Sequence, residues 1–117
     1  MNVFDGAVID TSLFVVGGDL NVYGGRIENY VAAADAGLVN VFGGIFSSVM
    51  VIDNGGVLNI ANGLFDDLRV LRGGVVNMSG GAFDRAPSGS GRFDLDQGGV
   101  ANISGGTFNN VDFAAFV

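Results

Sequence analysis

The chain alternates apolar and polar residues in short segments that recur at a nearly constant spacing. Each segment has an asparagine with an apolar residue on either side, as in LNV at 20–22, VNV at 39–41 and LNI at 58–60. Such alternation is typical of a β-strand, in which neighbouring side chains point to opposite faces. We therefore expect a strand around each asparagine, with the flanking apolar residues on a shared inner face.

The asparagines define a repeat with six copies: Asn2, Asn21, Asn40, Asn59, Asn77 and Asn102. Their spacing is 18 or 19 residues except for one interval of 25, which contains RAPSGSGR at 85–92. A proline, glycine and serine run of this kind predicts an inserted loop. Helical repeats need over 30 residues, whereas 18–19 residues fit one coil of a stacked β-ladder. The sequence predicts an all-β fold, a parallel β-helix (β-solenoid) of about six coils, as a single domain over 1–117.

Further columns appear when the copies are aligned on the asparagine. Six positions after it stand Val8, Ile27, Phe46, Phe65, Phe83 and Phe108, which predicts a stack of side chains along the core. Glycine pairs between the strands predict sharp turns, because glycine accepts positive φ. The asparagines are expected to form a ladder of side-chain amides. Strand alternation favours the outer face for this ladder, whereas a kink at the turn would bring it inside.

Two columns of apolar residues are predicted to face outward and are candidates for an interface. Phe4, Tyr23 and Phe42 stand two positions after the asparagine, and Phe14, Ile52 and Leu71 stand twelve positions after it, in the column that also holds Ala33. Exposed apolar strips of this kind mark contact with a partner. The alternative is that the alternation slips at a turn, so that these residues belong to the core. A carbohydrate-stacking role for the aromatic residues is a further possibility.

The composition excludes several kinds of chemistry. The net charge is -7 and there is no lysine, so binding to nucleic acid phosphates is not expected. Neither cysteine nor histidine is present, which rules out disulfides, thiolate zinc sites and Ser-His-Asp catalysis. We expect no cofactor.

No apolar run reaches the roughly 18 residues that span a bilayer, and the N-terminus lacks the basic start of a secretory signal. We therefore predict no transmembrane segment, and any export signal is expected to lie outside this sequence.

An acidic column offers the alternative to a non-catalytic role. Asp66 and Asp84 are expected one coil apart, near 5 Å, with Asp67 beside them, a spacing close to that of a retaining glycosidase pair. The same carboxylates are candidate calcium ligands. The favoured interpretation is a solvated turn, because six short coils offer almost no substrate cleft.

The segments GGDLNVYGG at 17–25, GGVVNMSGG at 73–81 and GGVANISGG at 98–106 carry a resemblance to a known family. The sequence resembles right-handed parallel β-helices, and within them the glycine-rich repeats of autotransporter passenger regions and related adhesins. It is similar, more weakly, to bactofilins, which are cytoskeletal β-helices. The resemblance implies an extracellular or cell-surface rod that adheres or self-associates, and the bactofilin alternative implies a cytoplasmic filament.

The two ends of the chain fall at equivalent points of the repeat, and neither end shows a polar capping segment. The sequence therefore predicts either a piece of a longer solenoid or a solenoid whose ends stack on other copies. We expect a non-enzymatic structural or adhesive module, a homo-oligomer or end-to-end assembly. A polysaccharide-binding or polysaccharide-cleaving fragment that uses Asp66, Asp67 and Asp84 is the alternative.

Overall fold

The computed structural model describes residues 1–84, 91–109 and 111–115, the last four by their main chain alone. Its elements are all strands: β1 (Asn2–Val3), β2 (Val8–Ile9), β3 (Leu13–Val16), β4 (Asp19–Val22), β5 (Arg26–Ile27), β6 (Val31–Ala34), β7 (Leu38–Val41), β8 (Ile45–Ile52), β9 (Val57–Ile60), β10 (Leu64–Val70), β11 (Val75–Met78), β12 (Ala82–Asp84), β13 (Arg92–Leu95), β14 (Val100–Ile103), β15 (Thr107–Asn109) and β16 (Asp112–Ala115). In this part of the chain, no helix has the length and apolar character needed to cross a membrane.

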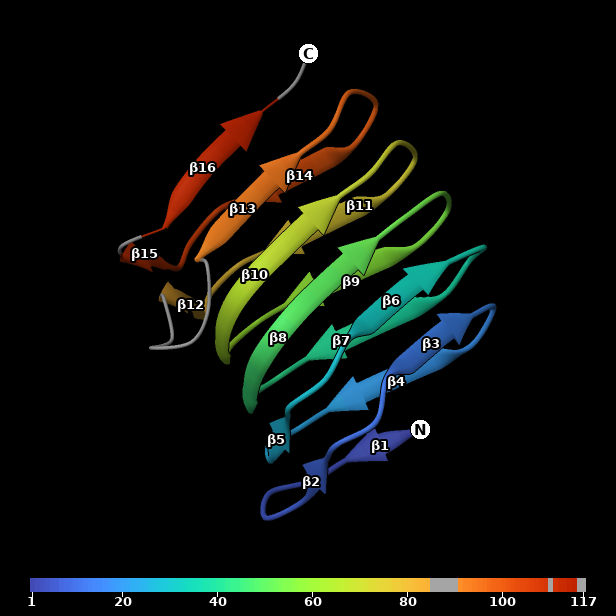
Figure 1. The fold of residues 1–117 in the computed structure, drawn as a ribbon, viewed down its shortest axis with the longest axis vertical. Helices are drawn as coiled ribbons and strands as arrows, with labels where there is room; N and C mark the ends of the chain where they lie inside the picture. Colours follow the sequence, from blue (N-terminus) through green and yellow to red (C-terminus); the bar gives the residue numbers. More distant parts are fainter. Residues whose placement is uncertain (85–90, 110, 116–117) are drawn as a thin grey trace.

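The strands form two parallel sheets that the chain visits in alternation, which makes the molecule a parallel β-solenoid (Figure 1). Sheet A has the order β1-β4-β7-β9-β11-β14. Sheet B contains the other ten strands, of which β8 and β10 run through its full width. We call one level of the stack a tier: one strand of sheet A with the sheet B strand or strands that follow it in the chain. In the tiers other than those of β8 and β10, the path through sheet B is divided between a short strand and a second strand, such as β5 followed by β6. The predicted fold class is confirmed.

The register of sheet A is set by the repeat. Asn2 pairs with Asn21, Asn21 with Asn40, and the same alignment continues through Asn59, Asn77 and Asn102. The solenoid has about four turns, fewer than the six coils expected, although sheet A has six strands and therefore six tiers. The first copy of the repeat contributes only two-residue strands in β1 and β2, and the last copy runs into residues outside the described part.

The inner faces of the two sheets form one continuous core. The column after the asparagine is at most 2% exposed at Val3, Val22, Val41, Ile60 and Met78. The predicted phenylalanine stack is confirmed at four positions, where ring centroids are 4.8 Å apart between Phe46 and Phe65, 5.0 Å between Phe65 and Phe83, and 5.4 Å between Phe83 and Phe108. Each apolar side chain is thus buried by its counterparts in the tiers above and below.

The predicted position of Val8 in this column is wrong. Val8 is 62% exposed, and it is Ile9 that pairs with Ile27. The corner between Val3 and Ile9 has one residue more than the corner between Val22 and Ile27. A constant spacing from the asparagine therefore selects the wrong residue in the first tier, and alternation then places it on the opposite face.

The predicted outward position of Ile52 is also wrong. Ile52 is fully buried and pairs with Ala33 and Val70, which are buried too. The column was misaligned because Phe14 pairs with Ala32 rather than Ala33. Phe14 itself does face outward, with 69% exposure, and Leu71 is half-buried just after β10.

The tight corners that lead from sheet B back to sheet A are made by the glycine pairs. The first glycine of the pair has a φ of 71° at Gly17, 79° at Gly55, 83° at Gly73 and 86° at Gly98, and Ala36 takes this place in the second corner with a φ of 68°. These values lie in the left-handed region that glycine enters without steric cost. The predicted inserted loop at 85–92 lies largely outside the described residues. The pairing offset rises from 18 at Phe65–Phe83 to 25 at Leu68–Phe93, so the seven extra residues fall between Phe83 and Phe93.

Candidate functional site

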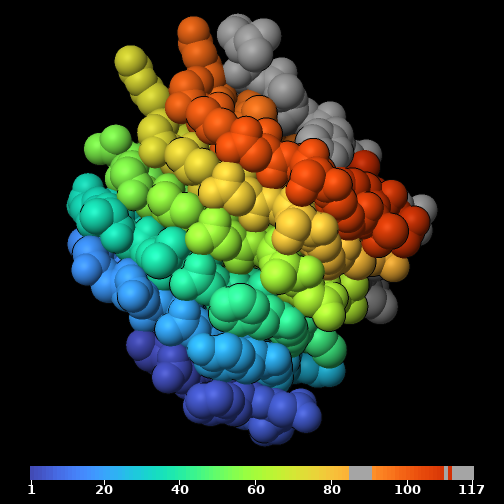
Figure 2. All heavy atoms as spheres, turned by 180° about the vertical axis from the view of Figure 1, so that it is seen from behind, coloured from blue at the N-terminus to red at the C-terminus, as the bar shows by residue number. Residues whose placement is uncertain are grey.

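The outer face of sheet A carries three straight columns of side chains. The middle column is the asparagine column, and two residues before it stand Asp19, Leu38, Val57, Val75 and Val100. Two residues after it stand Phe4, Tyr23, Phe42, Ala61, Ser79 and Ser104. Figure 2 shows the molecule from this side, with one colour band per tier in sequence order. Since residues two apart in a strand share a face, the columns lie side by side.

The asparagines form a ladder on this outer face. Each Nδ2 donates to the Oδ1 of the preceding tier, over 3.0 Å from Asn21 to Asn2 and over 2.9 Å from Asn102 to Asn77. The three bonds between them are 2.9 to 3.0 Å long. An amide has two N–H donors and two acceptor lone pairs, and the ladder uses one of each. Every tier therefore retains a donor and an acceptor for groups outside the ladder.

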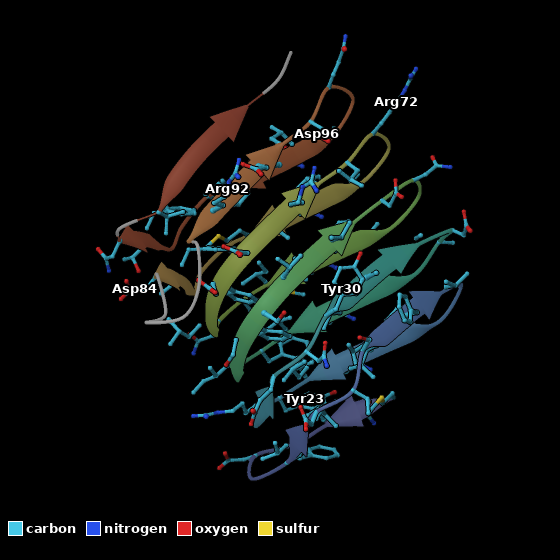
Figure 3. All side chains as sticks on the ribbon, viewed as in Figure 1. Tyr23, Tyr30, Arg72, Asp84, Arg92 and Asp96 are labelled. Atoms are coloured by element: carbon cyan, nitrogen blue, oxygen red, sulfur yellow. The ribbon has the colours of Figure 1, made fainter. Side chains whose placement is uncertain are left out.

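Three exposed aromatic residues form what we call the aromatic ridge: Phe4, Tyr23 and Phe42. Their centroids are 5.3 Å apart in both pairs, with interplanar angles of 9° and 13°, and their exposures are 58%, 48% and 49%. Because the rings stack face to face, the inner ring faces cover one another. Sugar rings bind aromatic side chains on an open ring face, so this stack offers little to a carbohydrate. Figure 3 shows Tyr23 far from the labelled Arg92 and Asp96.

In the column two residues after the asparagine, the residues that follow Phe42 are small, and a groove lies over them. The groove has a volume of about 620 Å³ and runs over Ala61, Ser79 and Ser104, with the ladder amides from Asn40 to Asn102 beside it and Phe42 at one end. The hydroxyl of Ser79, which lines the groove, donates to the carbonyl of Ile60 over 3.3 Å, and its oxygen can still accept a hydrogen bond. We call this feature the small-residue groove.

Within the described residues, the first tier carries the most exposed large apolar side chains. Met1, Val8, Phe14 and Val16 are 61%, 62%, 69% and 63% exposed. Met1, Phe14 and Val16 line a hollow of about 190 Å³, which also includes Leu13. Exposed apolar residues that lie together in this way are candidates for an interface.

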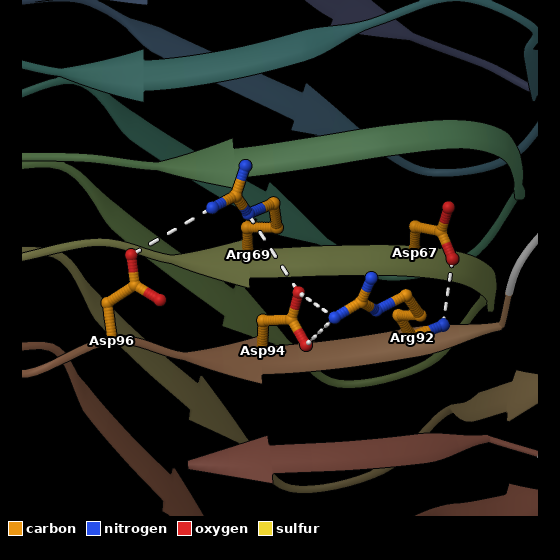
Figure 4. A network of polar contacts seen from close by, with 5 residues as sticks. All are labelled: Asp67, Arg69, Arg92, Asp94 and Asp96. Atoms are coloured by element: carbon orange, nitrogen blue, oxygen red, sulfur yellow. Dashed lines mark hydrogen bonds and ion pairs between the residues drawn. The ribbon is translucent and has the colours of Figure 1, made fainter. Parts of the chain in front are cut away.

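The outer face of sheet B carries an ionic network in its C-terminal half (Figure 4). The Asp94 carboxylate is 3.2 Å from Nη2 of Arg92 and 3.9 Å from Nε of Arg69, and Asp96 lies 4.0 Å from Arg69. Asp94 is only 7% exposed, whereas both guanidinium groups are about half exposed. The network joins β13 to β10 at the point where the chain returns after the inserted segment, and half-exposed ion pairs of this kind add modest stability.

The three carboxylates of the alternative site are not equivalent. Asp66 is 3% exposed and accepts a hydrogen bond from the Gly91 amide over 3.2 Å. Asp67 accepts one from the Arg92 amide over 2.8 Å, and Asp84 is half-buried at the end of β12. Among the described residues, no group of three or more acidic side chains is arranged to hold a metal ion. Asp66 and Asp67 thus fasten the start of β13 to β10.

We expect Asp66→Ala to destabilise the fold by about 1–3 kcal/mol, because the Gly91 amide then loses a buried acceptor. Asp84→Ala, at a half-buried position, is the matched control, with an expected change of about 0.5 kcal/mol or less. Urea denaturation of the three proteins measures both values. Equal stability of Asp66→Ala and the parent protein would mean that Asp66 is not an anchor.

Sequence reasoning missed the ionic network and the small-residue groove. Arg69 and Asp94 are 25 residues apart in the chain, across the inserted segment, although they are paired neighbours in the sheet. Alternation in LRVL at 68–71 and RFDL at 92–95 was the available signal, since it places the charged residues on one face. The groove was present in the column that begins with Phe4, at the change from large to small residues.

Comparisons with protein-family models, with curated proteins and with solved structures found no match to this chain.

Proposed function

We propose that this chain is a non-enzymatic structural module, a β-solenoid that stacks head to tail on further copies of itself to extend a rod. The proposal includes the finer assignment that the sequence suggests, an adhesive rod of the autotransporter-passenger type at the cell surface. A cytoplasmic filament is the alternative location for the same assembly. The support comes from the edge strands, the asparagine ladder and one glycine.

Within the part of the chain that the structure describes, the first and last tiers have partners on one side. β1, β2 and β3 pair with β4, β5 and β6, and β14, β15 and β16 pair with β11, β12 and β13. Edge strands present unpaired N–H and C=O groups that template a further strand. Because all tiers run in the same direction, a second copy added at either end repeats the same geometry. Such head-to-tail contacts do not close and produce filaments.

The asparagine ladder has complementary ends. All five of its bonds run in the same direction, from Nδ2 of one tier to Oδ1 of the tier before it. The ladder therefore ends with an amide donor at Asn2 and a carbonyl acceptor at Asn102. In a head-to-tail stack, Asn2 of one copy donates to Asn102 of the next, and the ladder continues without a change of polarity.

Gly18 is the observation that carries the proposal. In the equivalent corners Gly37, Gly56 and Gly74 lie directly over the carbonyls of Val15, Ala33 and Ile52, and an added Cβ would collide with those oxygens. A Cβ on Gly18 would meet nothing within 4 Å, and its φ is not positive. Neither space nor conformation within the chain requires a glycine at this position. In the stack, the end of a neighbouring β16 lies under Gly18 and supplies the missing constraint.

We therefore expect Gly18→Ala to fold with unchanged or slightly raised stability, by up to about 1 kcal/mol, and to lose rod formation. Val16→Lys, with its charge on the exposed edge of β3, is expected to do the same. Leu64→Lys, at a 41% exposed residue of a middle tier, is the control and keeps the rods. Light scattering against concentration and negative-stain microscopy compare the four proteins. Rods of Gly18→Ala that equal those of the parent, or a parent that stays monomeric at millimolar concentration, would contradict the proposal.

The second candidate is a polysaccharide site at Asp66, Asp67 and Asp84. It rests on the pairing of Phe65 with Phe83, because Asp66 and Asp84 directly follow these two paired residues. It has less support, because main-chain amides occupy an oxygen of both Asp66 and Asp67. Asp67→Asn and Asp84→Asn test it by oligosaccharide binding and cleavage. A loss of either activity would favour this candidate.

A further inference from the structure

We infer that the outer face of sheet A is a docking surface for a second copy of this chain, in which the aromatic ridge of each copy inserts into the small-residue groove of the other. This lateral pairing is independent of the head-to-tail stacking, because it uses the side-chain columns of sheet A and not the main-chain groups of an edge strand.

The self-complementarity follows from the order of residues in one column. Phe4, Tyr23 and Phe42 precede Ala61, Ser79 and Ser104, so a ridge of three tiers is followed by a groove of three tiers. A two-fold axis parallel to the strands, between β7 and β9, reverses the tier order while keeping each column in place. It sets Phe42 against Ala61, Tyr23 against Ser79 and Phe4 against Ser104 of the second copy. A contact of this type is isologous and closes as a dimer.

The polar groups of the face are matched by the same operation. The ladder of one copy lies along the ladder of the other, with Asn40 opposite Asn59, and each amide has one donor and one acceptor left for this contact. Tyr23 meets Ser79, whose hydroxyl donates to the Ile60 carbonyl of its own copy and can accept from the phenol. Because both copies have the same tier spacing of about 4.8 Å, the match holds along the whole face.

Charge and area indicate a weak contact with a second copy. Among the described residues of the three columns, Asp19 is the charged one, and it lies at the rim of the face, opposite Val75 in this arrangement. The five four-residue strands and the two-residue β1 give about 350 Å² of sheet plane per copy. The total of about 700 Å², to which the relief of ridge and groove adds, is below the roughly 1,000 Å² of a stable specific interface. A reversible, weak dimer is therefore expected.

The test uses Gly18→Ala as the parent, so that head-to-tail stacking does not contribute, and measures the dimer by sedimentation equilibrium. Ala61→Phe in this parent fills the groove and extends the ring stack from Phe42, so it keeps the fold while weakening the dimer at least about tenfold. Ala82→Phe, on the half-buried outward side of β12, is the matched control with unchanged association. Thermal melting verifies the folding of each variant.

A cross-linking experiment tests the two-fold arrangement, since the chain has no cysteine of its own. Asp19→Cys and Val75→Cys proteins, mixed with a short bismaleimide, are expected to cross-link between copies. Val75→Cys alone is not, because its two thiols would lie three tiers, about 14 Å, apart along the face. The inference is overturned if the parent stays monomeric, if Ala61→Phe associates as tightly as the parent, or if Val75→Cys alone links as well as the mixture. A monomeric parent whose groove binds oligosaccharides in an NMR titration would assign the groove to a carbohydrate instead.

Discussion

Gly37→Ala is expected to destabilise the solenoid by about 3 kcal/mol or more, within the upper range of single substitutions. Its Cβ would overlap the carbonyl oxygen of Val15, which belongs to the main chain of the preceding tier. Main chain cannot move aside as a flexible side chain can, so the two tiers must separate. That separation breaks hydrogen bonds such as the 2.8 Å bond from the Leu38 amide to the Gly18 carbonyl. Chemical denaturation measures the loss.

Gly18→Ala is the matched control for this prediction. Gly18 occupies the same corner position one tier earlier and has open space around it, so Gly18→Ala changes only the intrinsic preference of the residue. A loss of stability in Gly18→Ala as large as that in Gly37→Ala would show that the corners require glycine for conformation rather than for the contact between tiers.

Phe65→Ala is expected to cost about 3–5 kcal/mol. Phe65 is 1% exposed and stacks on Phe46 at 4.8 Å and on Phe83 at 5.0 Å, so its removal leaves a cavity and ends two ring contacts. Since stability for a chain of this length is on the order of 10 kcal/mol, the variant stays folded at room temperature but unfolds at a much lower denaturant concentration. Urea titration followed by circular dichroism measures the shift.

Phe14→Ala provides the comparison, because the same side chain is 69% exposed there. Its expected cost is about 1 kcal/mol or less, from a single tilted contact with Tyr30 at 5.8 Å. Similar losses in Phe14→Ala and Phe65→Ala would contradict the assignment of the ring column to the core axis.

The parallel register could be predicted from the sequence because identical residues recur at a fixed spacing. Stacking asparagine on asparagine and phenylalanine on phenylalanine is the arrangement that keeps every copy equivalent. The sequence leaves the facing of the asparagines open, and the structure places them outward, because the bonded amides lie on the same side as the aromatic ridge. The core around Phe46, Phe65 and Phe83 was predicted for the same reason.

Corner lengths could not be predicted, and they account for the errors at Val8 and Ile52. The first tier has one residue more before Ile9 and one fewer before Val22, so the spacing between asparagines stays at 19 and does not reveal the change. In the third tier, Val41 and Phe46 are both buried although they are five positions apart, so alternation counted from the asparagine assigns Ile52 to the wrong face. The role of Asp66 was hidden in a similar way. A register shift between Phe65 and Asp67 and the long return to Gly91 bring this carboxylate against a distant amide. No local pattern marks such a contact.

Fold and proposed function share one physical idea, that each tier is the template for the tier that follows. In the proposed stack, the hydrogen-bond polarity at Asn2 and Asn102, together with the open space at Gly18, would extend that templating across the boundary between copies. In the inferred dimer, the columns on sheet A would add a lateral contact with its own symmetry.

The most direct test is diffraction from aligned rods of the parent protein. We predict a reflection near 4.8 Å along the rod axis, from tiers that continue unbroken between copies, and an axial repeat of about 29 Å from the six strands of sheet A in each copy. Rods without an axial reflection near 4.8 Å, or a protein that remains monomeric at every accessible concentration, would contradict this prediction.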